Sequence, residues 1–422
     1  MISEVAILTS ANDPQTISCW DIRSGAVLGT LKGNKSDQRT ASPIHLPGAL
    51  APAMLAVAQN DRAVVHLWSW SKGQLHSKFV VPEKLSSLVV SNSGLYCVGG
   101  GLSGRIYVWE LQTGTLLRKF DAHYKPVRAL RFTPDDTAFL SSGEDSVTNV
   151  YLLASVFASL SDPNYPSHSD VCTPVASFSG HVLPITEMVV GAGAGFGSGV
   201  RMFTASLDRT VKIWDPTHPT PLATLLFPKP ITSLAVDPSE TRLYAGASDG
   251  SIFRADLYRR ETETAGTGIV GLREGVVEDG DAGGAVFRGH SQSVLSLSLS
   301  FDGTLLVSAS EDGTAIVWDT VSLQALRTFP QQKSPITDAT VIIKPAELMD
   351  ASVHHTLPVV KSFKTFQQQQ RPGSAEDGQA RFVEGRIVVS AVSGVSEVSG
   401  LGGLGWGGGE MSAIWLCSES LT

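Results

Sequence analysis

Residues 289–319, GHSQSVLSLSLSFDGTLLVSASEDGTAIVWD, constrain the fold more than any other stretch of the chain. They contain three runs in which apolar and small or polar residues alternate, ending near Leu299, Ser310 and Asp319. The turns between these runs each contain Asp-Gly. Alternation at period two, bounded by Asp-Gly turns, is typical of short antiparallel strands. The stretch therefore predicts a small antiparallel sheet.

The same stretch opens with Gly289-His290 and closes with Trp318-Asp319, about 30 residues later. This arrangement resembles the WD repeat, which has a period of about 40–45 residues and forms one four-stranded blade of a β-propeller. Superposing the stretch on the rest of the chain gives one third-strand anchor for each blade: Trp20, Trp68, Trp109, Tyr151, Trp214, Ala255 and Trp318. These anchors predict an all-β, seven-bladed propeller.

The order of the predicted strands indicates how the ring closes. The chain begins with residues 5–10, 16–20 and 26–31, which fit the second, third and outer strands of a blade that lacks its inner strand. Inner strands of the later blades are expected around residues 44–50, 85–90, 127–132, 185–190, 231–236 and 294–299. Residues 336–343 form one more inner strand with no blade after it. We expect this strand to complete the first blade, because pairing the two chain ends protects the open edges.

The propeller should span residues 1–345, and residues 346–422 should form a largely irregular, flexible tail rich in Gln and Gly. Three insertions interrupt the repeat, at residues 155–174, 191–199 and 259–284. The first and third extend the link between third and outer strands in blades 4 and 6, and the second lengthens a turn in blade 5. One further strand is suggested within the tail, at residues 386–392.

Composition excludes several classes of protein. A formal net charge of −8 argues against a free nucleic-acid binder, which usually carries a basic face. The four cysteines are far apart and lack C-x-x-C spacing, so neither a disulfide framework nor a zinc site is expected. The N-terminus lacks the features of a signal peptide, and no run approaches 18 apolar residues. We therefore expect an intracellular protein with no membrane span.

A histidine, a hydroxyl and an acid recur at one spacing and suggest a catalytic triad at first sight. Together with an aromatic anchor they form three sets: His290, Ser308, Asp312 and Trp318; His181, Thr204, Asp208 and Trp214; and His123, Ser141, Asp145 and Tyr151. A catalytic set would occur once, whereas this one occurs three times. In WD repeats these positions form a buried hydrogen-bonded chain that fixes the geometry of a blade. We therefore predict structural tetrads.

Three weaker motifs are also assigned to structure. Residues 246–250 match G-x-S-x-G around Ser248, but that motif needs a following helix and a strand is predicted here. Residues 191–199 are glycine-rich but match no phosphate-loop pattern. His354 and His355 have no further ligand at metal-binding spacing. We therefore expect no enzymatic activity, no cofactor and no metal.

Basic residues gather in the sequence near the start of the fourth blade. They are interleaved with aromatic residues and comprise Arg118, Lys119, Lys125, Arg128 and Arg131. Two interpretations stay open at this point: a solvated blade rim, or a contact with RNA phosphate or with an acidic partner.

Four segments of the N-terminal half resemble one family in particular. They are TISCWDIRSGAVLGTLKGN (16–34), GGLSGRIYVWELQTGTLLRKFDAHYKPVRALRF (100–132), SSGEDSVTNVYLLASVF (141–157) and SGHVLPITEMVVG (179–191). With the missing first strand and the order of insertions, they resemble the WD-repeat subunit of the rixosome. That complex is needed for internal-spacer processing of pre-rRNA and maturation of the large ribosomal subunit.

The resemblance implies a scaffold without enzymatic activity, located in the nucleolus and nucleoplasm. Its implied partners are the helical-repeat subunits of the rixosome, the midasin AAA ATPase and the pre-60S particle. The family's coiled-coil-like extension for self-association has no heptad counterpart at the C-terminus here, so the oligomeric state stays open, as does direct RNA contact. Two alternatives are a peptide- or histone-reading adaptor that uses an acidic channel mouth, and a hydrolase that uses Ser248.

Overall fold

The computed structural model describes residues 3–10, 16–46, 49–70, 74–161, 172–193, 195–197, 199–260, 270–277, 284–329 and 334–348. The chain divides into two compact units, Met1–Arg371 and Pro372–Thr422, and all described residues belong to the first. The strand suggested at residues 386–392 and the pair His354-His355 lie outside the described residues.

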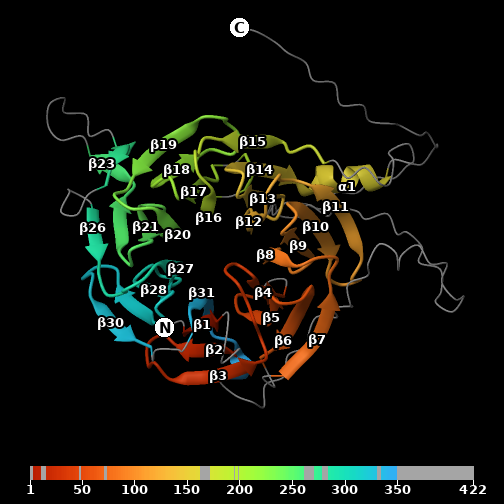
Figure 1. Cartoon of the computed structure of the whole chain (residues 1–422), viewed down its shortest axis with the longest axis horizontal. Coiled ribbons are helices and arrows are strands. Elements are labelled where there is room, and N and C mark those ends of the chain that lie inside the picture. The colour runs from red at the N-terminus through yellow and green to blue at the C-terminus, as the bar shows by residue number, and fades with distance from the viewer. Residues whose placement is uncertain are drawn as a thin grey trace, which may run out of the picture. The chain divides into compact units, whose positions relative to one another are not determined.

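Seven sheets are arranged as blades around a common axis, so the prediction of a seven-bladed β-propeller is confirmed (Figure 1). Blade 1 contains β1 (Glu4–Ser10), β2 (Thr16–Asp21), β3 (Val27–Lys32) and β31 (Ile336–Ile343). Blade 2 contains β4 (Ala41–His45), β5 (Pro52–Ala58), β6 (Val64–Ser69) and β7 (Gln74–Val80), and blade 3 contains β8 (Leu85–Val90), β9 (Tyr96–Gly101), β10 (Arg105–Glu110) and β11 (Leu116–Asp121). Blade 4 contains β12 (Val127–Phe132), β13 (Ala138–Gly143), β14 (Val147–Leu152) and β15 (Ala176–Ser179).

The last three blades follow the same order. Blade 5 contains β16 (Ile185–Val190), β17 (Met202–Ser206), β18 (Thr210–Trp214) and β19 (Pro221–Leu226). Blade 6 contains β20 (Ile231–Val236), β21 (Arg242–Ala247), β22 (Ile252–Asp256) and β26 (Gly284–Phe287). Blade 7 contains β27 (Val294–Leu299), β28 (Leu305–Ser310), β29 (Ala315–Asp319) and β30 (Ala325–Thr328). All seven anchor residues lie on the third strand of their blade.

Ring closure also follows the prediction. Strand β31 pairs antiparallel with β1 over its length, with Glu4 opposite Ile343 and Ala6 opposite Val341. The sheet order is β3-β2-β1-β31, so the last inner strand completes the first blade. The pairing covers the edge of β1, which would otherwise stay open and invite aggregation, and it places β31 in the innermost position that the inner strands occupy in the other blades.

The core is divided among the interfaces between neighbouring blades. Trp318 of blade 7 is 2% exposed and belongs to the same cluster as Tyr244 and Phe287 of blade 6. The Trp318 ring meets the Phe287 ring edge-on, with centroids 5.5 Å apart.

The turns that were predicted from Asp-Gly need a left-handed glycine, and Gly303 and Gly313 have φ values of +69° and +78°. Thus each blade is shaped by its turns and is stabilised by its neighbour.

Three segments differ from the simple repeat. The inner strand of blade 2 is Ala41–His45, which begins earlier than the expected 44–50. A helix, α1 (Leu153–Ser161), begins the first insertion. In the third insertion, β23 (Tyr258–Arg260) pairs with β24 (Val270–Leu272), and β25 (Gly275–Val276) adds a parallel strand to β19 of blade 5.

Candidate functional site

The inner strands of the seven blades surround the central channel and run in one direction, since every blade has the same strand order. We call the face where the inner strands begin the upper face, and the face where they end the lower face. The loops before the inner strands and the turns between second and third strands lie on the upper face. The remaining turns lie on the lower face.

Two of the predicted tetrads form complete hydrogen-bonded chains. In blade 7, His290 Nε2 lies 2.7 Å from Ser308 Oγ and His290 Nδ1 lies 3.3 Å from Asp312 Oδ2, and Trp318 Nε1 donates to the same Ser308 Oγ at 2.8 Å. Blade 5 repeats this chain: His181 contacts Thr204 Oγ1 at 2.8 Å and Asp208 Oδ2 at 3.0 Å, and Trp214 Nε1 donates to Thr204 Oγ1 at 2.8 Å.

The third set is joined only in part. In blade 4, His123 Nε2 lies 2.8 Å from Ser141 Oγ, and His123 Nδ1 lies 3.1 Å from both carboxylate oxygens of Asp145. Among the described residues, no hydrogen bond joins Tyr151 to Ser141. Instead the Tyr151 ring stacks on Phe139, with centroids 5.3 Å apart. A phenol thus fills the volume of the indole without its N–H contact.

Blade 2 contains a related network that sequence reasoning missed. The buried Asn34 Oδ1 accepts from Trp68 Nε1 at 3.0 Å and from Gln59 Nε2 at 3.2 Å, and His66 Nδ1 lies 3.1 Å away. Asn34 follows Gly33 as His290 follows Gly289, so a Gly-Asn pair at the expected position was the available signal.

Burial of the hydroxyl, rather than the charge state of the tetrads, argues against catalysis. Although burial raises the pKa of Asp208, hydrogen bonds from His181 and Thr210 outweigh it and hold that pKa well below its usual range. Burial lowers the pKa of His290 and favours its neutral form. The hydroxyl that a nucleophile would need is inaccessible, since Ser308 is 0% exposed and already contacts Trp318. The tetrad therefore has the acid–histidine–hydroxyl contacts of a triad but lacks an accessible nucleophile.

Each tetrad aspartate also fixes the loop that follows its histidine. The main-chain N–H groups of Tyr124, Val182 and Ser291 donate to Asp145, Asp208 and Asp312 at 3.1, 3.1 and 2.9 Å. These three residues occupy equivalent positions on the upper face. Tyr124 is 100% exposed and Val182 is 85% exposed. The side chains of Tyr124 and Val182 are therefore exposed to solvent, while their main chains are fixed by hydrogen bonds to Asp145 and Asp208.

A layer of buried charge crosses the channel. Arg39 Nε donates to Glu187 Oε2 at 2.6 Å, and Arg131 Nη2 donates to Glu187 Oε1 at 3.0 Å. A second carboxylate in the layer, Asp338, accepts from Ser296 Oγ at 2.8 Å, and burial raises its pKa. Sequence reasoning identified only Arg131 of these residues, because period-two patterns do not distinguish an inward charge from a solvated one.

Arg39 reaches this layer from a loop that enters the upper mouth of the channel. Seven positions separate Asn34 from Ala41, the first residue of β4, whereas four separate His290 from Val294. Ser36, Arg39 and Thr40 of this loop are buried, and Arg39 has a left-handed φ of +58°. Both oxygens of Glu187 accept from arginines, so this carboxylate is not free to form the acidic pocket that the peptide-reading alternative requires.

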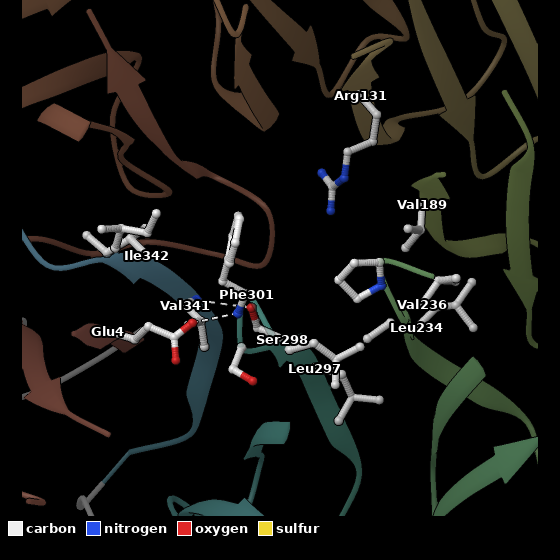
Figure 2. A pocket seen from close by; sticks show the side chains of 15 residues that line it. Glu4, Arg131, Val189, Leu234, Val236, Leu297, Ser298, Phe301, Val341 and Ile342 are labelled. Carbon is white, nitrogen blue, oxygen red and sulfur yellow. Dashed lines mark hydrogen bonds between the residues drawn. The ribbon is translucent and has the colours of Figure 1, made fainter. Parts of the chain in front are cut away.

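The lower mouth opens into an apolar cavity of about 620 Å³. Figure 2 shows its lining, which includes Val189, Val236, Leu297 and Val341 from four inner strands and Phe301 from a turn. Arg131 extends toward the middle of the cavity (Figure 2). The lower cavity is therefore mostly apolar, and its lining has two charged groups: the Arg131 guanidinium at the inner end of the cavity, which we call its floor, and the Glu4 carboxylate.

The five basic residues that the sequence places near the start of blade 4 do not form one patch. Arg118 is buried and donates to the carbonyl of Val156 in α1 at 3.1 Å, whereas Arg131 lies in the channel. Arg128 pairs with Glu144 at 3.4 Å. Lys119 is half-buried on the outer strand β11, and Lys125 is exposed on the upper face. The five residues lie on β11, on β12 and in the loop between these strands, and their side chains point in different directions.

The remaining candidates can be placed briefly. Ser248 is an exposed turn residue, and the segment after it is strand β22 rather than a helix. Within the described residues, no group of three or more His, Cys, Asp or Glu side chains is arranged to hold a metal ion. In the same part of the chain, no helix is long and apolar enough to span a membrane.

The chain has clear similarity to known proteins. The family model "WD domain, G-beta repeat" matches residues 114–151, 172–215, 219–253 and 284–319. WD repeat-containing protein 18 of Mus musculus is 34% identical over 381 residues, which cover 90% of this chain and 82% of that protein. Pre-rRNA-processing protein IPI3 of Yarrowia lipolytica is 36% identical over 291 residues, covering 68% and 64% of the two chains. Protein ROOT INITIATION DEFECTIVE 3 of Arabidopsis thaliana is 31% identical over 349 residues, covering 81% and 73%.

Proposed function

Since the chain belongs to the WD-repeat family that includes WD repeat-containing protein 18 and pre-rRNA-processing protein IPI3, we propose that it is a non-catalytic scaffold of ribosome biogenesis. It acts in internal-spacer processing of pre-rRNA and in maturation of the large subunit precursor. Its site of action is the nucleus, in the nucleolus and nucleoplasm. The scaffold is the propeller of residues 1–345, followed by a tail at 346–422.

The scaffold docks the helical-repeat subunits of the processing complex and helps to recruit the midasin AAA ATPase to the pre-60S particle. The observation that carries the docking role is the fixed exposure of Tyr124 and Val182 on the upper face. An aromatic ring and an aliphatic side chain on rigid loops are suited to protein contacts, because little ordering entropy is lost on binding. The neighbouring exposed Leu183 and Lys125 extend the same surface with an apolar and a cationic group.

Substitution of one surface valine tests this proposal. Val182→Asp places a charge on the upper face while its main-chain N–H can still donate to Asp208. A tagged variant should lose the helical-repeat subunits and midasin in affinity purification with mass spectrometry. Cells that contain only this variant should accumulate spacer-containing pre-rRNA on a blot.

Val321→Asp is the matched control, since Val321 is a valine that is 71% exposed in a turn on the lower face. It should keep the partners and process pre-rRNA normally. Equal recovery of partners by both variants would refute the upper-face docking role. Failure of the wild-type protein to recover these partners would refute the scaffold function itself.

A further inference from the structure

The lower cavity is a second candidate binding site, on the face opposite Tyr124 and Val182. Its walls come from inner strands of several blades and from the turn at Phe301, and they are mostly aliphatic. Its volume of about 620 Å³ is within the roughly 300–1,000 Å³ that is typical of ligand sites in proteins. The cavity therefore has room for a few side chains of a partner.

The floor of this cavity supplies a cationic group with unused hydrogen-bonding capacity. Arg131 has five N–H donors, and the hydrogen bonds of the described residues engage two of its nitrogens, with Leu130 O at 3.0 Å and Glu187 Oε1 at 3.0 Å. Its side chain is 34% exposed, whereas that of its partner Glu187 is 7% exposed. Behind it, Arg39 shares the same carboxylate. Arg131 thus faces the cavity, whereas the Glu187 carboxylate is covered. The other carboxylate of the lining, Glu4, is 4% exposed, and its Oε1 accepts from the Phe301 main chain.

We propose that the lower cavity binds a peptide of a partner protein in which an aliphatic or aromatic residue lies beside an Asp or Glu. The apolar side chain enters the cavity between Val236 and Val341, and the carboxylate accepts hydrogen bonds from Arg131. A charge-assisted bond between carboxylate and guanidinium is about twice as strong as a neutral one and fixes orientation. The aliphatic wall excludes water from this pair.

The rim of the cavity favours a peptide over a small molecule. Phe301 lines the cavity and is still 60% exposed, so a ligand confined to the interior would leave most of this ring in water. A chain that leaves the cavity and continues across the lower face would cover the ring. The Phe301 backbone is held in place, since its N–H donates to the buried Glu4 at 2.5 Å. A fixed aromatic residue at the mouth is therefore available to pack on the peptide.

Selection from a random nonapeptide library displayed on phage, with the full-length protein as bait, tests the proposal. Enriched peptides should carry Asp or Glu within two residues of Leu, Ile or Phe. A synthetic peptide from this set is then titrated by fluorescence anisotropy. Arg131→Gln should weaken its binding by at least about tenfold, and exchange of the peptide carboxylate for the amide should weaken it similarly. The two changes together should cost little more than either alone, because both remove one interaction.

Two matched variants control for indirect effects. Arg128→Gln removes an arginine of the same strand, with a side chain that is 37% exposed and paired with Glu144. Leu326→Ala removes a side chain of the same blade as Phe301 that is 58% exposed. Both should leave the affinity within about twofold, whereas Phe301→Ala should weaken it at least about threefold. Melting temperatures confirm that all four variants are folded.

Three results would overturn the proposal. They are an absence of enriched peptides, enrichment of peptides without a carboxylate, and additive losses for Arg131→Gln and the amide peptide. The inference does not depend on the proposed upper-face docking, because Val182→Asp leaves the lower cavity intact. If Val182→Asp no longer recovers the processing complex but still binds the synthetic peptide, the upper-face docking and the peptide site are shown to be independent.

Discussion

Arg39 and Glu187 are 148 positions apart in the chain, yet Arg39 Nε donates to Glu187 Oε2 at 2.6 Å inside the channel. The two side chains are 4% and 7% exposed. The Nη2 group of Arg39 also donates to the carbonyl of Thr232 at 3.2 Å. One side chain from the loop before blade 2 therefore contacts blades 5 and 6 across the ring axis.

Loss of this contact should destabilise the whole propeller. Arg39→Ala leaves Glu187 buried with one arginine instead of two, and removing one partner of a buried pair costs about 3–5 kcal/mol. We expect the free energy of unfolding in urea to fall by about 3 kcal/mol. Arg62→Ala is the control, since Arg62 is 80% exposed and pairs with Asp61 at only 3.8 Å. A change of less than about 0.5 kcal/mol is expected there, and equal changes for both variants would contradict the role of the charge layer.

The tetrad of blade 7 should contribute to stability through Asp312. Asp312→Ala removes the acceptor for His290 and for the Ser291 main chain, and should cost about 1–3 kcal/mol. Asp249→Ala changes the equivalent turn position of blade 6, where the aspartate accepts from Ser251 N in its own turn. Thermal unfolding should therefore show a clearly lower melting temperature for Asp312→Ala than for Asp249→Ala. An unchanged melting temperature would refute the structural role of the tetrad.

The free energy of unfolding should decrease in two steps as the pH is lowered. The pKa of His290 is lowered by burial, so the unfolded chain binds a proton below about pH 6.5 that the folded protein resists, and stability declines as pH falls through this range. The pKa values of Asp145, Asp208 and Asp312 are also lowered in the folded state, mainly by hydrogen bonds that outweigh burial. Their contribution is present above about pH 4 and is lost below it.

Urea unfolding between pH 8 and pH 3 measures both steps. His290→Gln should reduce the slope of the unfolding free energy between pH 6.5 and pH 5. It should leave the decline below pH 4 in place, since Asp145 and Asp208 are unchanged. Stability that increases as the solution is acidified would be incompatible with these shifts.

Ring closure predicts unequal effects of two truncations. Deleting residues 336–422 removes β31 and exposes the edge of β1 along its whole length, so the ring should open or unfold. Deleting residues 350–422 keeps every described strand, and its melting temperature should match that of the full chain. Circular dichroism and thermal unfolding distinguish the two, and equal stability of both proteins would refute closure by β31.

The repeat of the sequence was sufficient to locate most of the fold. Six of the seven inner strands were expected at the positions where they occur, because alternation between turns depends on local backbone preferences. The pairing of β31 with β1 followed from a count of strands without partners. The inner strand of blade 2 was expected at 44–50 and lies at Ala41–His45, after a loop whose length departs from that of blade 7.

The sequence by itself determined most of the strands, the number of blades and the residues of the two complete tetrads, since all of these recur at a fixed local spacing. Only the tertiary structure decided which charges face the channel. It separated Arg118, Arg128 and Arg131 into three environments and joined Arg39 to Glu187. The physical reason is that closing a ring brings together side chains from blades far apart in the chain, and no local pattern records the neighbours that a side chain will meet at the axis.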